Sequence, residues 1–294
     1  MDDYARFFKR YLEIAPYRSP FLYGKNSTIG CGGMARIAFF PENLSQTVRL
    51  LSALEKDSVP YVVLGNLSNV LPPDGIGEKI VVSTRRLTGV VVEKSVFSYA
   101  GTTAGAFLAA CKRAGKTGAE FLAGIPCTIG GAAYMNAGAD GRYLDETVQS
   151  VVVFRRGEMV TLPKTDCGYA YKESVFMRDG SVILGVNFLL HDGKQEEIAE
   201  KTEYYLKRRR DLPKGGSMGC VFKNPPGGYA GKLIEGSGLK GLRIGGAYVS
   251  DIHANFIINE GEKARDVKAL IHTVKNAVYA QYGVRLQEEI RYLT

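Results

Sequence analysis

The sequence predicts an α+β fold. Short apolar runs of strand length alternate with longer stretches that carry apolar residues at helical spacing. No internal repeat or low-complexity tract interrupts this order. A length of 294 residues, 45% of them apolar, is enough for two or three compact units that each have a core. We therefore expect a globular protein of mixed helices and strands.

The N-terminal part predicts a β-α-β unit of about 50 residues, preceded by a helix and turn within 1–20 that end near Pro20. Its helix, at 44–54, follows Pro41 and Asn43, which are typical of a helix start. The apolar positions of this helix are Val48, Leu51 and Leu54. Strands are expected at 36–40, 61–64 and 80–83.

The middle of the chain predicts a strand at 90–99 and then a helix at 104–113, which Gly115 closes. A glycine-rich stretch follows this helix. Further strands are expected at 150–155, 159–162 and 182–190. This part therefore predicts a mixture of strands and one helix.

The C-terminal third predicts a helix at 195–209 and a long glycine- and proline-rich loop at 211–228. The last helix carries Val267, Leu270, Ile271, Val274, Ala277 and Val278 on one face and stops at Gly283. The remaining expected elements are a short helix at 230–235 and strands at 247–250, 254–259 and 288–293.

Charge and composition exclude several classes of protein. The net charge is +8, but its only dense run, 207–210, ends a predicted helix, where cations complement the helix dipole. The rest of the charge is spread out, which favours small polyanionic ligands over nucleic acid. Five cysteines without a CxxC pair, and three histidines without HxxxH spacing, argue against a disulfide framework and against a metal site. Without a signal peptide pattern or a membrane-length apolar run, we expect a cytoplasmic protein.

Glycine is unusually abundant and clustered. The chain has 35 glycines, roughly one residue in eight against a usual share of about 7%. Such clusters occur where the backbone takes positive φ or approaches a ligand closely, so they indicate a large phosphate-bearing ligand held by main-chain atoms. One cluster, 236–241, matches G-x-G-x-x-G. A predicted helix precedes it and two glycines follow it, so we interpret it as a helix end and turn, not a dinucleotide-binding motif.

The segment 64–71 directly follows a predicted buried strand. Its small and polar residues predict a turn whose N–H groups converge on an anion, although an ordinary polar turn would have the same composition. It lacks the Gly-Lys-Ser/Thr of a phosphate-binding P-loop. The candidate cofactor-binding residues here are Gly65, Asn66, Leu67, Ser68 and Asn69.

The segment 124–138 is apolar, yet rich in glycine and other small residues, which predicts neither a good helix nor a good strand. Such backbone can lie against a planar ligand and its diphosphate; a tight crossing in a core is the alternative. The candidate cofactor-binding residues here are Pro126, Thr128, Gly130, Gly131, Asn136, Ala137 and Gly138. A third segment, 217–225, lies in the long loop and contains Cys220, for which burial as a small apolar side chain is the alternative to a functional role.

In this order, the segments resemble the UDP-N-acetylenolpyruvoylglucosamine reductase family, flavoenzymes of bacterial peptidoglycan precursor synthesis. The matching stretches are 26–30, 64–74, 120–141, 169–176, 217–225, 230–241, 253–259 and 286–291. The resemblance implies a two-part FAD-binding domain of the vanillyl-alcohol oxidase (PCMH) type, at 1–85 and 86–192, and a substrate-binding α+β domain at 193–294. The length resembles the shorter class of the family, which lacks an extra tyrosine-bearing loop.

The resemblance also implies ligands and a reaction. NADPH reduces FAD, and flavin N5 then delivers hydride to UDP-N-acetylglucosamine enolpyruvate, giving UDP-N-acetylmuramate. Some relatives of the wider fold attach FAD through histidine, but no histidine precedes His191, so we expect non-covalent FAD. Cys127 stands where the family usually has the glycine of Ile-Pro-Gly. We expect a monomer, with no nucleic acid or membrane as partner.

Three catalytic residues are carried over from the family. Cys220 takes the position of the family's proton-donating serine, and a thiol is a far stronger acid than an alcohol. Lys172 takes the position of an arginine, keeping the charge but losing the bidentate fork. Glu289 matches the third group, which supports the intermediate or shuttles a proton. The candidate substrate-binding residues are Lys223, Asn224 and Lys232, for the uridine diphosphate and sugar, and Tyr171 and Ser174, beside the flavin or substrate.

Two alternatives remain open. Another FAD-dependent oxidase of the same fold, such as a sugar or lactone oxidase, would need neither a donor at Cys220 nor Glu289. An inactive flavin-binding relative is suggested by departures from the family pattern. These departures are Leu67 (where the family usually has glycine), Cys127, Lys172 and Cys220.

Overall fold

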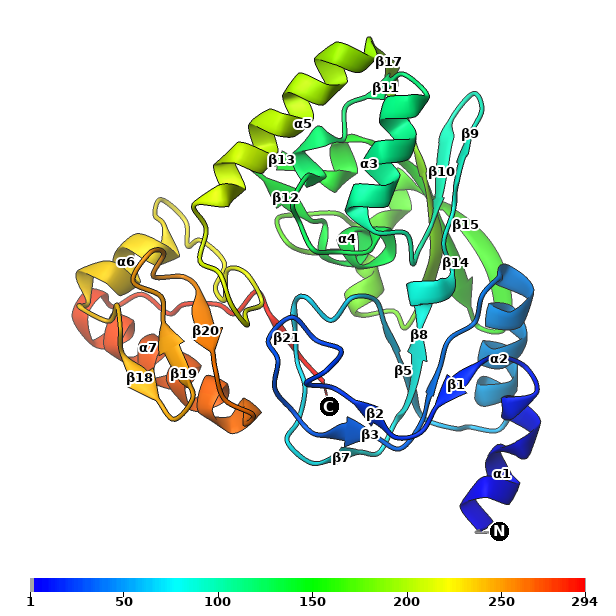
Figure 1. The fold of residues 1–294 in the computed structure, drawn as a ribbon, viewed down its shortest axis with the longest axis horizontal. Coiled ribbons are helices and arrows are strands. Elements are labelled where there is room, and N and C mark those ends of the chain that lie inside the picture. The colour runs from blue at the N-terminus through cyan, green and yellow to red at the C-terminus, as the bar shows by residue number, and fades with distance from the viewer. Residues whose placement is uncertain (1–2, 294) are drawn as a thin grey trace. The chain divides into compact units, whose positions relative to one another are not determined.

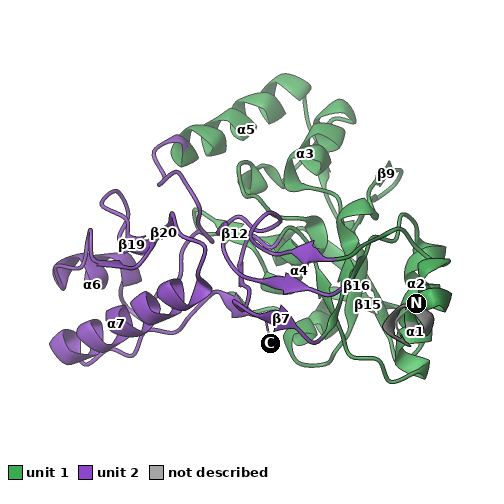
Figure 2. Ribbon diagram, turned by 60° about the horizontal axis from the view of Figure 1, so that its bottom comes forward, with its two compact units in different colours: residues 1–19, 37–66, 79–209 green, residues 20–36, 67–78, 210–294 purple. Residues whose placement is uncertain are grey.

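The computed structural model describes the backbone of residues 3–293, and the chain forms two compact units (Figure 2). Unit 1 comprises Met1–Ser19, Ile37–Asn66 and Lys79–Arg209. Unit 2 comprises Pro20–Arg36, Leu67–Glu78 and Arg210–Thr294. Both are therefore discontinuous in sequence, and the division into 1–85, 86–192 and 193–294 stays a prediction.

The first sheet of unit 1 confirms the predicted β-α-β unit. Its four strands lie in the order β1 (Tyr17–Arg18), β4 (Ala38–Phe39), β8 (Ile80–Ser83) and β5 (Tyr61–Leu64) (Figure 1). Both β4 and β5 run parallel to β8, as a crossover through α2 (Leu44–Lys56) requires. The Asn43 side chain accepts from Gln46 N at 2.9 Å, which caps α2 as expected. Together with α1 (Asp3–Leu12), these elements form one apolar core.

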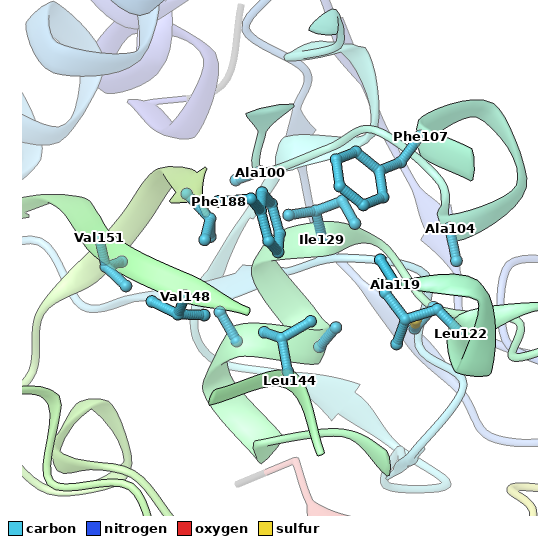
Figure 3. Packing of buried hydrophobic residues seen from close by; sticks show 14 of the residues in the cluster. Ala100, Ala104, Phe107, Ala119, Leu122, Ile129, Leu144, Val148, Val151 and Phe188 are labelled. Atoms are coloured by element: carbon cyan, nitrogen blue, oxygen red, sulfur yellow. The ribbon is translucent and has the colours of Figure 1, made fainter. Parts of the chain in front are cut away.

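The second sheet of unit 1 is antiparallel. Its strand order is β15 (Glu158–Pro163), β14 (Val148–Arg155), β16 (Val182–Phe188), β10 (Val96–Tyr99) and β9 (Val90–Val92). The single strand predicted at 90–99 is wrong: Glu93 N donates to Ser95 O, which turns the chain and makes a hairpin of β9 and β10. A second core lies between this sheet and α3 (Ala104–Arg113), where the rings of Phe107 and Phe188 are 4.5 Å apart (Figure 3).

A short helix, α4 (Ile129–Met135), forms in the glycine-rich stretch where neither helix nor strand was predicted. Its packing explains the difference. A Cβ on Gly130 would lie 2.8 Å from Ala100 Cβ, so glycine lets the helix approach the backbone at Ala100, whose carbonyl accepts from Gly130 N at 2.8 Å. Tertiary packing thus overrides a weak local propensity.

Short elements complete unit 1. Two strand pairs form, β11 (Lys116–Thr117) with β17 (His191–Asp192) and β12 (Gly138–Ala139) with β13 (Arg142–Tyr143). The last helix is α5 (Gln195–Arg210), close to its predicted bounds. The 3-10 helices are η1 (Thr84–Arg86), η2 (Glu120–Leu122), η3 (Leu144–Glu146), η4 (Lys164–Cys167) and η5 (Val175–Met177).

Unit 2 is built around α7 (Ala264–Tyr282), whose buried face and stop at Gly283 (φ +68°) are as predicted. Its strand groups are β18 (Arg243–Ile244), β19 (Ala247–Val249) and β20 (Ile257–Asn259); β2 (Phe21–Leu22), β3 (Met34–Ala35) and β7 (Ile76–Gly77); and β6 (Val70–Leu71) with β21 (Arg291–Tyr292). The predicted closing strand is thus shorter than 288–293. Asp74 accepts from Ala264 N and Arg265 N, which fixes the first turn of α7 to a segment from early in the sequence.

The G-x-G-x-x-G segment is a helix end and turn, as predicted. The short helix α6 (Ala230–Gly236) precedes it, and Gly238 and Gly241 have positive φ. Within residues 3–293, no helix is long and apolar enough to cross a membrane. The same residues contain no group of three or more potential metal ligands close enough to hold an ion.

Candidate functional site

Two segments that the sequence assigned separately to the cofactor meet in unit 1. Gly65, directly after β5, lies against Thr128, so closely that a Cβ would be 2.4 Å from Thr128 Oγ1. Asn66 Nδ2 donates to Pro126 O at 2.8 Å. Residues 65–66 and 126–128 therefore share one small-residue cradle in unit 1, in which a side chain at position 65 has no room.

Arg85 belongs to this cradle, although the sequence did not single it out. Its Nη2 donates to Asn66 O at 3.0 Å, from η1, which directly follows the buried strand β8. Burial, and secondly repulsion from Arg18, lowers the pKa of Arg85. A cation immediately after a buried strand was the signal that could have identified it, because such a side chain is held partly out of water beside the cofactor segments.

The remaining loop residues, Leu67, Ser68 and Asn69, belong to unit 2. Leu67 has φ +49° and is only 3% exposed. It thus adopts the left-handed conformation that favours glycine, the residue usual in the family, and its side chain is buried. Asn69 Nδ2 donates to Glu289 O at 3.1 Å, and Asn69 O accepts from Arg291 N at 2.9 Å. The predicted phosphate loop is therefore bonded to the backbone of a predicted catalytic residue.

The start of α4 is tightly packed. Thr128 Oγ1 caps the helix by accepting a hydrogen bond from Gly131 N at 3.3 Å. Gly130 N donates to Ala100 O. Cys127 is buried, and burial raises the pKa of its thiol to about 12. A thiol this buried stays protonated at neutral pH and is a poor nucleophile, and the non-covalent binding of FAD stays a prediction.

The end of α4 is shaped by Asn136 and Gly138. Asn136 has φ +43° and is buried, with both ends of its side-chain amide bonded to backbone of unit 1. Ala137 N donates to Ala132 O, which closes the helix. A Cβ on Gly138 would lie 2.2 Å from Arg142 O, so the β12–β13 hairpin requires glycine there.

Lys172 lies at the tip of a two-residue turn in unit 1. Ala170 and Glu173 exchange two backbone hydrogen bonds of 3.1 Å each, and Lys172 has φ +56°. Tyr171, the other tip residue, is 40% exposed, and its ring contacts that of Tyr143 edge to face at 6.0 Å. Ser174 is fully buried, and its Oγ donates to Tyr134 O at 2.6 Å, so its hydroxyl is used within the unit.

The segments that contain Cys220 and Glu289 pair through their backbones in unit 2. Glu289 N donates to Val221 O at 2.8 Å, and Lys223 N donates to Gln287 O at 2.8 Å. On the other side of the same segment, Cys220 forms a β-bridge with Phe256. The long loop at 211–228 therefore contributes an extended segment between residues 255–256 and 287–289. The third predicted catalytic residue, Lys172, belongs to unit 1.

The predicted substrate-binding residues of unit 2 lie around α6. Asn224 Oδ1 accepts from Ala230 N at 3.0 Å, at the start of this helix. Lys232 is exposed on α6, with Nζ 5.3 Å from the centre of the Tyr229 ring. Lys223 is half-buried in the segment beside Glu289. These contacts do not test substrate binding, which stays a prediction.

His253 and Asn255 support the same segment and were not predicted as functional. Asn255 N donates to His253 Nδ1 at 3.2 Å, a bond that needs that ring nitrogen unprotonated. Burial lowers the pKa of His253, which is consistent with this neutral form. The only signal in the sequence was that both residues fall within the family-like stretch 253–259.

Buried hydroxyls also fit a ligand. Among the described residues, the Tyr169 hydroxyl in unit 1 and the Ser27 hydroxyl in unit 2 are buried without a hydrogen-bond partner. Burial raises the pKa of Tyr169, so its hydroxyl stays a donor. Unsatisfied buried hydroxyls are costly, so each is a group that a bound ligand or water would stabilise. Within unit 1, the Tyr169 hydroxyl and the cradle at Gly65 and Thr128 are each compatible with a polar ligand.

Comparison with known proteins gives concordant results. Residues 35–163 match the model of an FAD binding domain, and residues 211–293 match that of the UDP-N-acetylenolpyruvoylglucosamine reductase C-terminal domain. A UDP-N-acetylenolpyruvoylglucosamine reductase from Caldicellulosiruptor bescii is 37% identical over 278 residues, 91% of this chain and 87% of that protein. UDP-N-acetylenolpyruvoylglucosamine reductase 2 from Bacillus cereus is 39% identical over 283 residues, which cover 91% of this chain and 90% of that protein.

The fold agrees with these matches. A crystal structure of UDP-N-acetylenolpyruvylglucosamine reductase from Thermus caldophilus superposes with a TM-score of 0.82 at 32% identity, covering 95% of this chain and 100% of that one. The predicted fold class, an FAD-binding domain followed by a C-terminal α+β domain, is therefore confirmed.

Proposed function

The chain belongs to the UDP-N-acetylenolpyruvoylglucosamine reductase family, and on that premise we propose that it reduces UDP-N-acetylglucosamine enolpyruvate to UDP-N-acetylmuramate with NADPH. The net reaction consumes NADPH, one proton and the enolpyruvyl double bond. It yields NADP⁺ and the saturated lactyl ether. The chain's part in this reaction is to hold the ligands, oppose the charge that develops, and supply the proton.

The cofactor would be held by the cradle of unit 1 and by residues 67–69, which follow it in the sequence. Gly65, Asn66 and Thr128 form a closely packed turn of small and polar residues, and Arg85 adds a positive charge that suits a diphosphate. When bound, FAD would supply the redox chemistry that transfers a hydride from NADPH to the terminal enol carbon of the substrate. The positive net charge of the chain, +8, favours all three polyanionic ligands.

Cys220 is the proposed proton donor. Hydride addition at the terminal carbon leaves negative charge on the adjacent carbon, spread into the carboxylate, and that carbon must be protonated. The observation that carries this assignment is the backbone pairing of the Cys220 segment with residues 287–289, through the 2.8 Å bond from Glu289 N to Val221 O. This pairing supports the proposal because it joins the segment that contains Cys220 to the segment that contains Glu289. Cys220 is partly exposed, whereas the other four cysteines are buried.

Lys172 and Glu289 are proposed to support the intermediate. Lys172 supplies a positive charge to oppose the enolate, although an ammonium group lacks the planar fork of arginine. Its turn fixes the backbone from which this charge extends, because Ala170 and Glu173 bond to each other across it. Glu289, beside Val221, would shuttle or balance the proton that Cys220 donates. Lys223, Asn224 and Lys232 are the proposed contacts to the uridine diphosphate and sugar.

The test is an anaerobic experiment in two steps. The purified flavoprotein is reduced with one equivalent of NADPH, and UDP-N-acetylglucosamine enolpyruvate is then added while the flavin spectrum is followed. The proposal predicts prompt return of the oxidised spectrum, and in Cys220→Ala loss of this second step alone. A flavin that stays reduced until air enters would indicate an oxidase. A protein that takes up FAD but whose flavin is not reduced by NADPH would indicate an inactive relative.

The monomeric state and the cytoplasmic location stay predictions.

A further inference from the structure

The turn that carries Lys172 is held by the end of α4, the helix within the predicted cofactor segment. Ala170 O accepts two hydrogen bonds, one from Glu173 N at 3.1 Å and one from Asn136 Nδ2 at 3.0 Å. The first bond closes the turn, and the second ties it to Asn136. One carbonyl therefore links the geometry of the Lys172 turn to the helix end.

Asn136 is well suited to hold the turn because both ends of its side-chain amide form hydrogen bonds and the residue is buried. Its Oδ1 accepts from Asp145 N at 3.0 Å while Nδ2 donates to Ala170 O, and the residue is 3% exposed. It also ends α4 in the left-handed conformation, φ +43°, which asparagine tolerates better than most residues. With both ends of the amide fixed, the side chain cannot rotate without losing two bonds.

A second anchor holds the far side of the turn. Ser174, at 0% exposure, donates through Oγ to Tyr134 O at 2.6 Å, in the last turn of α4. Carbonyls at a helix C-terminus lack partners within the helix, so this hydroxyl satisfies one of them. Asn136 and Ser174 thus hold the turn by a hydrogen bond at each end. Lys172, at φ +56°, has a backbone conformation that is unfavourable without such support.

We propose that Asn136 is a positioning residue that fixes Lys172 for reduction of the substrate, with Ser174 as the second anchor. The inference rests on the proposed function, since it assumes that Lys172 opposes charge on the substrate. It assigns to Asn136 a task other than direct contact with the cofactor, because both polar ends of its side chain are bonded within the unit.

Two variants of Asn136, one that adds a charge and one that does not, test whether this residue fixes the Lys172 turn. Asn136→Asp keeps the acceptor for Asp145 N but turns the donor to Ala170 O into a repelling oxygen. Asn136→Gly removes the amide without adding charge and keeps the left-handed backbone. The matched control is Asn187→Asp, the same chemical change in the same unit, where Asn187 Nδ2 contacts Ser150 Oγ at 2.9 Å within the five-stranded sheet.

The first readout is the two half-reactions. Both Asn136 variants should slow flavin reoxidation by substrate roughly 10- to 100-fold, the scale expected when a positioned group shifts by about 1 Å. Flavin reduction by NADPH should stay within about twofold, because that step does not use Lys172. In a Lys172→Ala background the Asn136 changes should add no further slowing, since the group they position is absent.

The second readout needs no turnover. The amides of Ala170 and Glu173 bond across the turn, so their hydrogen exchange in the full-length protein should be faster in both Asn136 variants and unchanged in Asn187→Asp. The positioning role would be overturned if the Asn136 changes slowed reoxidation as much in the Lys172→Ala protein as in the wild-type protein. It would also be overturned if the Asn136 variants reoxidised at the wild-type rate while Lys172→Ala was slow. Wild-type reoxidation in Lys172→Ala itself would overturn the proposed role of Lys172, and this inference with it.

Discussion

Asn255 holds the backbone of Phe222 by both ends of its side-chain amide. Its Oδ1 accepts from Phe222 N at 2.9 Å, and its Nδ2 donates to Phe222 O at 2.8 Å. Both residues are buried, so this pairing fixes the segment that contains Cys220. One buried side chain thus satisfies two backbone groups that would otherwise lack partners.

Asn255→Ala should lower the free energy of unfolding by about 2–4 kcal/mol, because it leaves the two Phe222 backbone groups buried and unbonded. Urea unfolding measures this loss. Asn276→Ala, which removes an exposed amide on α7 beside His272, is the control and should change stability by less than about 0.5 kcal/mol. Equal losses in the free energy of unfolding for the two substitutions would show that the hydrogen bonds to Phe222 do not contribute to stability.

Gly65→Ala should be destabilising in the wild-type chain and much less so when Thr128 is alanine. The new Cβ would meet Thr128 Oγ1 at 2.4 Å, and moving that oxygen sacrifices the cap of α4, worth about 1 kcal/mol. A double-mutant cycle with Thr128→Ala, followed by chemical unfolding and flavin content, measures the coupling. Gly105→Ala, with open space at its Cβ within α3, should instead be neutral or stabilising. Strictly additive effects at positions 65 and 128 would contradict the contact.

Cys220 should be the cysteine that iodoacetamide modifies first in the folded protein. Burial raises the pKa of Cys31, Cys111 and Cys127 to about 12 and that of Cys167 to about 11, so these four are protonated and shielded at pH 8. Peptide mapping at short times should find one adduct, and reoxidation by substrate should be lost with it. Cys220→Ser, which restores the family's donor, should resist the reagent and remain active. Rapid inhibition of that variant would place the sensitive thiol elsewhere.

The same four thiols predict that stability falls on the alkaline side. Their pKa values are higher in the folded than in the unfolded chain, so their contribution is complete well below about pH 8.5, the pKa of an unfolded thiol, where both states are protonated. Between pH 8.5 and 11 the unfolded chain releases these protons first, and each thiol lowers stability by about 1.4 kcal/mol per pH unit. Urea unfolding from pH 7 to 10 should show this decline. Cys111→Ala should give a shallower one, and an unchanged slope would contradict the assignment.

Local signals predicted the elements whose ends and apolar faces are both marked in the sequence. Asn43 begins α2 and Gly283 ends α7 as expected, because caps and stops act over a few residues. By contrast, α4 depends on Gly130 fitting against Ala100, a packing contact that leaves no periodic pattern. Glycine-rich sequence alone therefore favoured an irregular segment.

The family resemblance named the candidate catalytic residues, which stay predictions, and it named none of the residues that support them from distant parts of the sequence. Cys220, Lys172 and Glu289 were named through motif positions. Arg85 and Asn255 act on Asn66 and Phe222, 19 and 33 residues away in sequence, and neither belongs to a recognisable spacing. The local signals at Arg85 and Asn255 do not name these distant partners, because the fold decides which residues they contact.

The interleaved make-up of unit 2 has a consequence for synthesis of the chain. Strand β6, at Val70–Leu71, pairs in parallel with β21, at Arg291–Tyr292, and Asp74 anchors a helix that begins at Ala264. During translation, the early segments must therefore wait for nearly the whole chain to be made before their partners exist. Closing such long loops is entropically costly and slow. We expect the N-terminal sheet with α2 to acquire protection first on the ribosome, and Leu67–Glu78 only after the last strand has been released from the exit tunnel.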